Sequence, residues 1–80
     1  MALPQGVTDY LNENAQNNGA AAPQPGDDLF KAGVLDSFAL VDFIGVLETE
    51  TGISVPDSDV KAANFQTIEA IERYVESRKG

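Results

Sequence analysis

The sequence predicts a small all-α fold, with three longer helices and one short helix packed around a single core. Three segments place apolar residues at helical spacing, and no segment alternates apolar and polar residues over a useful strand length. A chain of 80 residues forms one domain at most, so we expect a single domain over residues 1–80. The apolar content of 42% is sufficient for a small core.

The first segment predicts a helix over about residues 4–16. Leu3, Val7 and Leu11 fall on one face of such a helix, and Tyr10 lies beside them. Several asparagines follow in the same segment, and asparagine is a poor residue in helix interiors. We therefore expect a weak helix that ends before Gly19.

A long loop is predicted from about residue 17 to residue 36. Pro23, Pro25 and Gly26 exclude regular structure in its middle. The loop is longer than most connections in compact domains, so we expect it to be functional or partly mobile. Its second half carries apolar residues that are expected to dock onto the core: Leu29, Phe30, Val34 and Leu35.

The second helix, predicted over about residues 37–51, has the clearest pattern. Asp36 is a good N-cap, Leu35 and Leu40 are placed to form a hydrophobic staple, and Gly52 is a good C-cap. Four apolar residues at helical spacing form its core stripe: Leu40, Phe43, Ile44 and Leu47. Gly45 lies on the opposite face, where a mid-helix glycine costs about 0.5–1 kcal/mol relative to alanine.

Two further helices are predicted after an extended segment at residues 53–56. A short helix is expected at about residues 57–63. The last helix is expected over about residues 67–78, with Thr67 as its N-cap. Ile68, Ile71 and Val75 make its apolar stripe, with Tyr74 beside them.

The composition excludes several kinds of chemistry. Without histidine or cysteine, the chain has no Ser-His nucleophilic pair, no disulfide and no common zinc site. The Asp57–Asp59 segment begins like a calcium loop, but Ala62 and Ile68 stand where such a loop requires glycine and glutamate. We therefore predict no metal site.

Charge and hydropathy indicate which classes of partner to exclude and which cellular location to expect. The net charge of −8 argues against nucleic-acid binding. Residues 27–59 contain eight acidic residues and one lysine. This excess of negative charge favours a basic partner surface or serves only solubility. No segment is apolar enough to insert into a membrane, and the N-terminus does not read as a secretory signal. Together with the absence of cysteine, this favours a cytoplasmic protein.

An Asp-Ser pair stands where the long loop meets the second helix. The hydroxyl of Ser37 would lie at the positive end of the helix dipole, which stabilises phosphate groups and developing negative charge. Taken alone, the pair is too common to be informative, and a serine at this position most often only caps a helix. Its meaning depends on the residues that follow it.

The sequence resembles the acyl carrier protein family, including its aminoacyl and peptidyl relatives. The resemblance covers about residues 27–76 and begins with Asp36-Ser37-Phe38. The Val55-Pro56 pair and the segment Asn64-Phe65-Gln66-Thr67-Ile68 then follow at the family's spacing. This resemblance implies a four-helix bundle of acyl-carrier type.

The resemblance also implies a cofactor and a role. A phosphopantetheinyl transferase would move 4′-phosphopantetheine from coenzyme A onto Ser37, with Asp36 beside it at the cofactor site. The arm would hold an acyl or aminoacyl thioester and present it to partner enzymes of fatty-acid or secondary-metabolite biosynthesis. The carrier itself would catalyse nothing, and magnesium would belong to the transferase complex. The further partners implied are a loading ligase and downstream acyl-processing enzymes, and we expect a monomer.

The second helix is the docking surface that the resemblance implies. The outward residues carried over from the family pattern are Phe38, Ala39, Asp42, Gly45, Val46, Glu48 and Thr49. If cargo is held between the helices, the core-stripe residues Leu40, Phe43, Ile44 and Leu47 would line its pocket; otherwise they are plain core.

This docking face departs from the fatty-acid pattern. Ala39, Gly45 and Thr49 stand where fatty-acid carriers commonly have acidic residues or methionine. We therefore expect a stand-alone carrier in a specialised acyl or aminoacyl pathway. A general fatty-acid carrier and an unmodified acidic interaction module remain the alternatives.

Overall fold

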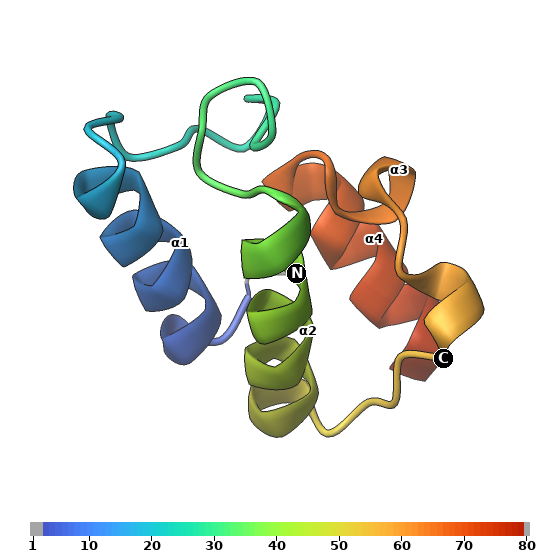
Figure 1. The fold of residues 1–80 in the computed structure, drawn as a ribbon. Coiled ribbons are helices and arrows are strands. Elements are labelled where there is room, and N and C mark those ends of the chain that lie inside the picture. The colour runs from blue at the N-terminus through green and yellow to red at the C-terminus, as the bar shows by residue number, and fades with distance from the viewer. Residues whose placement is uncertain (1–2, 80) are drawn as a thin grey trace.

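The computed structural model describes residues 3–79, which contain helices and no strand. Three longer helices are present: α1 (Gln5–Asn17), α2 (Ser37–Thr51) and α4 (Ile68–Lys79). Between α2 and α4 lie the 3-10 helix η1 (Asp57–Asp59) and the short helix α3 (Ala62–Phe65). The prediction of an all-α bundle with three longer helices is confirmed (Figure 1).

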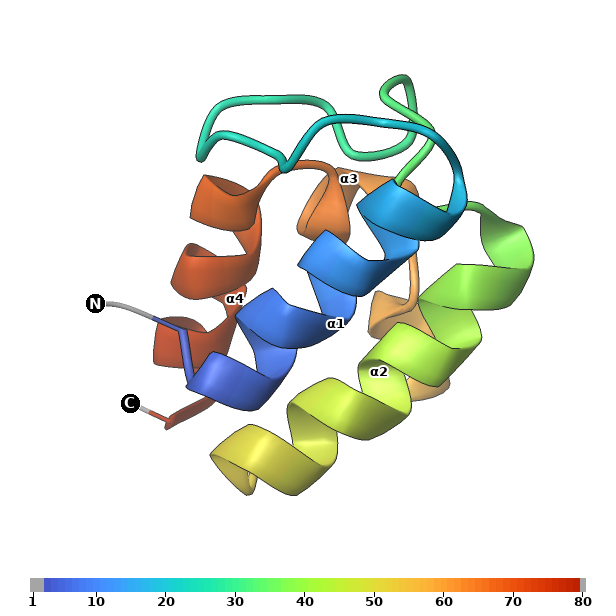
Figure 2. The same ribbon diagram turned by 90° about the vertical axis from the view of Figure 1, so that its left-hand side faces the viewer.

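Helices α1 and α2 lie side by side, and α3 and α4 pack together against them (Figures 1 and 2). The loop of residues 18–36 passes over the end of the bundle at which α2 begins. The start of α2 therefore lies at a corner of the molecule, below a loop that is itself packed onto the helices.

An aromatic series runs through the core and connects the four α-helices. The Phe43 ring lies with its centroid 5.8 Å from that of Tyr10 and 6.3 Å from that of Phe65. Phe65 in turn contacts Tyr74 edge to face at 5.1 Å. Such offset and edge contacts add about 0.5–1.5 kcal/mol per pair beyond area burial. Phe43 on α2 is therefore the central residue of the core.

The apolar faces that the spacing predicts are buried, except that Ile68 at the start of α4 is half-buried. In α2 the buried residues are Leu40, Phe43, Ile44 and Leu47. In α1 they are Val7, Leu11 and Ala15, and in α4 they are Ile71 and Val75. The core is thus formed by one stripe from each longer helix, together with Phe65 and the docked part of the loop.

Both ends of α2 are capped as the sequence predicts. The carboxylate of Asp36 accepts hydrogen bonds from the backbone N–H groups of Phe38 (3.0 Å) and Ala39 (2.8 Å). At the other end Gly52 has φ +77°, in the left-handed region that glycine adopts without steric cost. At the start of α4, Thr67 caps the helix as Asp36 caps α2: the Thr67 hydroxyl accepts a hydrogen bond from the Ala70 N–H at 3.0 Å.

The second half of the long loop is held by backbone hydrogen bonds to α4 and the residues before it. The Leu29 N–H donates to the Gln66 carbonyl at 2.7 Å, and the Glu69 N–H donates to the Pro25 carbonyl at 3.2 Å. Leu29, Val34 and Leu35 are buried in the core, with Phe30 half-buried, which confirms the predicted docking.

Side chains at the end of α1 hold the loop from the other side. Asn18 donates to the Gly33 carbonyl at 2.7 Å, and Asn14 donates to the Val34 carbonyl at 3.4 Å. The asparagines that weaken α1 as a helix therefore have a structural role, because they supply the donors that satisfy loop carbonyls.

Where the sequence predicts one short helix at about residues 57–63, the structure has two shorter elements. Val60 and Lys61 are not helical and separate η1 from α3. Hydrogen bonds of Asp59 to two other elements fix this break: its carbonyl accepts from the Asn64 side chain at 2.8 Å, and its carboxylate accepts from the Tyr74 hydroxyl at 2.8 Å. The spacing of apolar residues along the chain does not predict such hydrogen bonds.

Candidate functional site at the start of α2

Ser37 is the first residue of α2, and its side chain is exposed to solvent. Asp36 makes the side-chain hydrogen bonds at this helix start, which leaves the Ser37 hydroxyl unengaged within the described residues 3–79. The hydroxyl lies at the N-terminus of a helix of 15 residues, where the dipole is positive. An oxygen placed this way suits attachment of a phosphate-linked group, because the negative charge of the phosphodiester is stabilised there.

The surface of α2 next to Ser37 exposes two large apolar side chains. Phe38 is 87% exposed and Val41 is 66% exposed. Phe38 belongs to the predicted docking set, whereas Val41 was missed because it directly follows the core residue Leu40. Because they are three positions apart on a helix, the two side chains are neighbours on the exposed face of α2.

The structure divides the remaining predicted docking residues between different surroundings. Asp42, Gly45 and Thr49 are exposed, and Ala39 and Val46 are half-buried at the edge of the core. The Ala39 carbonyl also accepts a hydrogen bond from the Tyr10 hydroxyl of α1 at 3.2 Å.

Glu48 is the member of the set with a clear structural role. It is half-buried, and its carboxylate accepts a hydrogen bond from the Val55 N–H at 2.8 Å. This bond holds the extended segment at residues 53–55 beside α2. No sequence signal indicates it, since the two residues are seven positions apart and in different elements.

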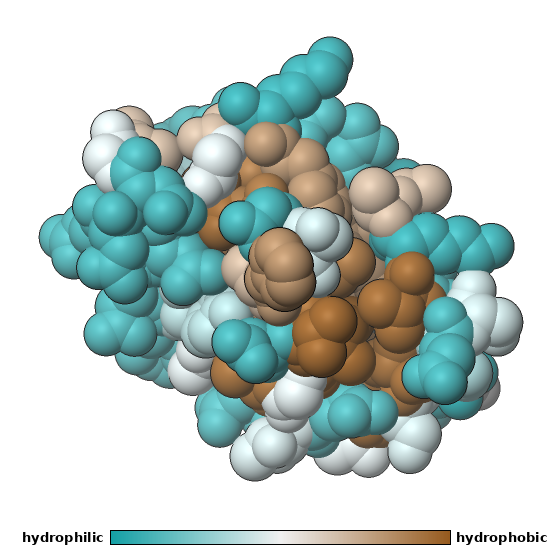
Figure 3. All heavy atoms as spheres, viewed as in Figure 1, coloured by the Kyte–Doolittle hydropathy of each residue, from teal (hydrophilic) through white to brown (hydrophobic). Residues whose placement is uncertain are grey.

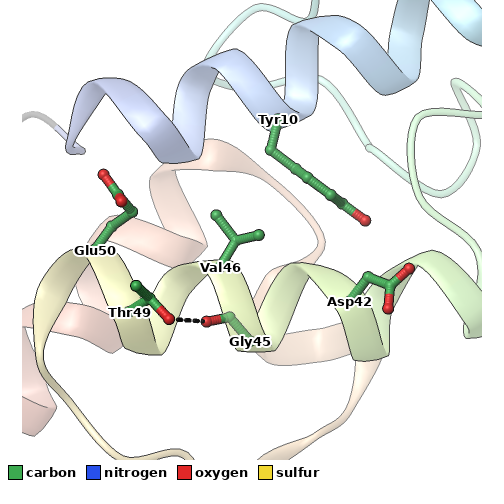
Figure 4. A pocket seen from close by; sticks show the side chains of 6 residues that line it. All are labelled: Tyr10, Asp42, Gly45, Val46, Thr49 and Glu50. Atoms are coloured by element: carbon green, nitrogen blue, oxygen red, sulfur yellow. Dashed lines mark hydrogen bonds between the residues drawn. The ribbon is translucent and has the colours of Figure 1, made fainter.

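Two grooves flank α2. The first, of about 600 Å³, lies between α1 and α2 and is lined by Tyr10, Asp42, Gly45, Val46, Thr49 and Glu50 (Figure 4). The second, of about 360 Å³, lies between α2 and the segment that follows it, and is lined by Val41, Ile44, Gly45, Glu48, Val55, Asp57 and Val60. Apolar side chains gather on this side of α2 in Figure 3. Gly45 borders both grooves.

The predicted cargo-pocket residues lie mainly inside the core. Phe43 and Leu47 are fully buried, and Leu40 is 7% exposed. Ile44 is the member of this set that lines the second groove.

Within residues 3–79, the structure has neither a group of side chains placed for a metal ion nor a helix suited to spanning a membrane. Among residues 3–79, no group of three or more acidic side chains is placed to bind a metal ion. The Asp59 carboxylate instead accepts a hydrogen bond from the Tyr74 hydroxyl. Burial together with this hydrogen bond raises the pKa of Tyr74 to about 12. No helix in this part of the chain is long and apolar enough to cross a bilayer.

The comparisons with known proteins identify the family. The family model described as "Phosphopantetheine attachment site" matches residues 14–75, which include Ser37 and all of α2. The chain belongs to the phosphopantetheine-attachment family. It is also 33% identical over 67 residues to the D-alanyl carrier protein of Bacillus velezensis, an alignment that covers 84% of this chain and 85% of that protein.

The cofactor of this carrier protein is covalently attached 4′-phosphopantetheine. When bound, the group supplies a flexible arm whose thiol holds cargo as a thioester. The start of α2 fits such a group, because Ser37 presents an exposed, unengaged hydroxyl at the positive end of a capped helix. Carrier proteins of this family work with phosphopantetheinyl transferases and with the enzymes that load and process the cargo.

Proposed function

We propose that Ser37 carries the 4′-phosphopantetheine arm and that this chain presents a thioester-bound acyl or aminoacyl group to partner enzymes. The observation that supports this proposal is the exposed and unengaged hydroxyl of Ser37 at the first residue of α2. Asp36 supports the site by capping the helix through Phe38 and Ala39, which fixes the backbone on both sides of the serine.

The proposed cargo belongs to a specialised acyl or aminoacyl pathway, rather than to general fatty-acid synthesis. The similarity to a D-alanyl carrier protein favours an aminoacyl cargo. Phe43 and Leu47, two of the four core-stripe residues, are fully buried in the packed core. This packing favours a short cargo over a long acyl chain. A general fatty-acid carrier remains the alternative.

Partner enzymes are proposed to dock on α2, beside the arm. Phe38 offers an exposed apolar contact, and Asp42 offers a negative charge to a basic surface. The enzymes proposed here are a phosphopantetheinyl transferase, a loading ligase and downstream acyl-processing enzymes. Catalysis belongs to these partners, and the carrier acts as a monomer.

Loss of function in the Ser37→Ala variant tests the proposal in a cell that depends on this protein. We expect no growth or no pathway product, with helix content by circular dichroism unchanged. Ser58→Ala is the matched control, because Ser58 is an exposed serine on η1, away from the start of α2, and it is expected to retain function. Full function in Ser37→Ala would contradict the proposal and point to an unmodified interaction module.

Native mass spectrometry tests the cargo. The protein purified together with its pathway enzymes is expected to carry an aminoacyl or another short specialised acyl group. Ordinary fatty acyl chains of graded length on the thiol would contradict this part of the proposal and support the general fatty-acid alternative.

A further inference from the structure

Three polar side chains follow one face of α1 at intervals of four residues. They are Tyr10, Asn14 and Asn18, of which Asn18 is the C-cap residue of the helix. Residues four apart on an α-helix are neighbours on its surface, so the three form a stripe about 12 Å long. Tyr10 and Asn14 are half-buried, and polar groups in such positions need hydrogen-bond partners. The stripe therefore presents three hydrogen-bond donors to the segment beside it.

Before Ser37, two of these side chains hold the last turn of the long loop. Asn18 donates a hydrogen bond to the Gly33 carbonyl at 2.7 Å, and Asn14 donates to the Val34 carbonyl at 3.4 Å. The turn is also closed on itself, because the N–H groups of residues 34 and 35 both donate to the carbonyl of residue 29, at 2.9 and 3.1 Å. The loop therefore reaches α2 along a fixed path.

After Ser37, the third side chain holds the first turn of α2. The Tyr10 hydroxyl, directed from α1 toward α2 in Figure 4, donates to the Ala39 carbonyl at 3.2 Å. A carbonyl oxygen has two lone pairs, so it can accept this bond in addition to one within the helix. The Tyr10 ring packs against Phe43 with centroids 5.8 Å apart, which fixes the position of the hydroxyl. One face of α1 thus holds the backbone on both sides of Ser37.

We propose that Tyr10, Asn14 and Asn18 are positioning residues for attachment of the arm. They hold the backbone around Ser37 so that its hydroxyl and the adjoining face of α2 reach the transferase in one arrangement. The inference rests on the proposed attachment at Ser37, and it gives α1 a part in that reaction.

The chemistry of the transfer explains why this position matters. The Ser37 oxygen forms a bond to the phosphorus that carries the pantetheine group of coenzyme A, and the P–O bond between the two phosphates breaks. Adenosine 3′,5′-bisphosphate leaves, and the hydroxyl proton passes to the transferase complex. Such a displacement requires the attacking oxygen to lie in line with the leaving oxygen, about 3–3.5 Å from phosphorus. When the binding-competent arrangement of a protein is less populated, its apparent affinity falls by the same factor.

Two double variants with the same chemical change test the proposal. Tyr10→Phe/Asn18→Ala removes two of the hydrogen bonds from α1 and keeps the aromatic ring in the core. Tyr74→Phe/Asn64→Ala is the matched control, because it also removes one tyrosine and one asparagine hydrogen bond, both made to Asp59. Both proteins are assayed as substrates of a broad-specificity phosphopantetheinyl transferase, at a temperature where circular dichroism shows that they are folded.

We expect the Michaelis constant KM of Tyr10→Phe/Asn18→Ala to rise about fivefold or more, with kcat within about twofold of the wild type. The reason is that each lost hydrogen bond shifts the population of the competent arrangement by about two- to tenfold. The control is expected to keep both constants within about twofold of the wild type. Equal KM values in the two double variants would overturn the proposal alone. No modification of the wild type by two different transferases would overturn the attachment at Ser37 as well.

Amide hydrogen exchange tests the same positioning without a transferase. The Val34 and Leu35 amides are expected to exchange about two- to tenfold faster in Tyr10→Phe/Asn18→Ala than in the wild type, because the turn opens more often. In the control they are expected to keep the wild-type rate. Unchanged exchange in Tyr10→Phe/Asn18→Ala would overturn the proposal. If a double variant does not fold, Tyr10→Phe and Tyr74→Phe give the same comparison, since each loses only one hydroxyl.

Discussion

At the start of α2, two adjacent residues have different roles. The Asp36 carboxylate is directed back to the helix, where it satisfies the N–H groups of Phe38 and Ala39. The Ser37 hydroxyl is left exposed, as the proposed attachment requires. A serine that had to cap the helix itself would hold its oxygen against the backbone, so the preceding aspartate is what leaves the hydroxyl available.

Asp36→Ala is expected to destabilise the protein by about 0.5–2 kcal/mol, because two backbone N–H groups at the start of α2 lose their acceptor. Urea unfolding followed by circular dichroism measures the change. Asp36→Asn retains a side-chain acceptor and is expected to lose clearly less. Equal stability of Asp36→Ala and the wild type would show that the cap contributes nothing.

Tyr74 gives the stability a dependence on alkaline pH. Burial and the hydrogen bond to Asp59 raise the pKa of Tyr74 from 10.0 to about 12 in the folded protein. Because the folded state holds the proton more tightly, this contribution is complete below pH 10 and is lost as the pH rises toward 12. The unfolding free energy of the wild type should therefore fall more steeply between pH 10 and pH 12 than that of Tyr74→Phe. Parallel curves would contradict this account.

Among the secondary-structure elements, α2 and its C-cap contain two glycines with opposite expected effects on stability. Gly45 lowers helix stability and no contact inside the protein requires it, whereas the backbone conformation at Gly52 requires glycine. Gly45 is exposed with open space around it, so Gly45→Ala is expected to stabilise the protein by about 0.5–1 kcal/mol. Gly52 has φ +77°, so Gly52→Ala is expected to destabilise it by about 1–2 kcal/mol. Thermal unfolding of the two variants measures both effects. A destabilising Gly45→Ala would mean that glycine serves the fold itself.

The elements also show what the sequence could predict. The spacing of Leu40, Phe43 and Leu47 is a local property of the chain, so it predicts the buried face of α2, and the same holds for its caps. The bond from Val55 to Glu48 joins residues in different elements, and no local rule assigns a polar side chain to such a distant partner. For this reason the role of Glu48 and the division of the docking set could not be predicted.

The long loop shows the same difference between local and distant contacts. Its proline and glycine content predicts an irregular segment, but not that the segment is held at both ends. The Asp28 carboxylate accepts a hydrogen bond from Gln66, 38 residues away, and also from the N–H groups of Phe30 and Lys31. The bond from Gln66, followed by those from the backbone, lowers the pKa of Asp28. The loop is consequently part of the folded unit that presents Ser37.

For the molecule as a whole, Phe43 connects the two halves of the core. It is fully buried and its ring contacts Tyr10 and Phe65. Phe43→Ala is expected to cost about 3–5 kcal/mol. A domain of this length has only about 4–12 kcal/mol of stability, so the variant should lose a large fraction of its unfolding free energy.

Phe38→Ala is the matched control, since the Phe38 side chain is 87% exposed and its loss should change stability by no more than about 0.5 kcal/mol. Denaturant unfolding of the two variants decides the comparison. Similar stabilities would show that Phe43 is not central to the core.

The central claim is that Ser37 is the attachment point of the arm. The most direct test is the intact mass of the protein before and after incubation with coenzyme A, magnesium and a broad-specificity phosphopantetheinyl transferase. We predict a gain of one phosphopantetheine in the wild type and none in Ser37→Ala. A gain that persists in Ser37→Ala, or no gain with two different transferases, would contradict this account.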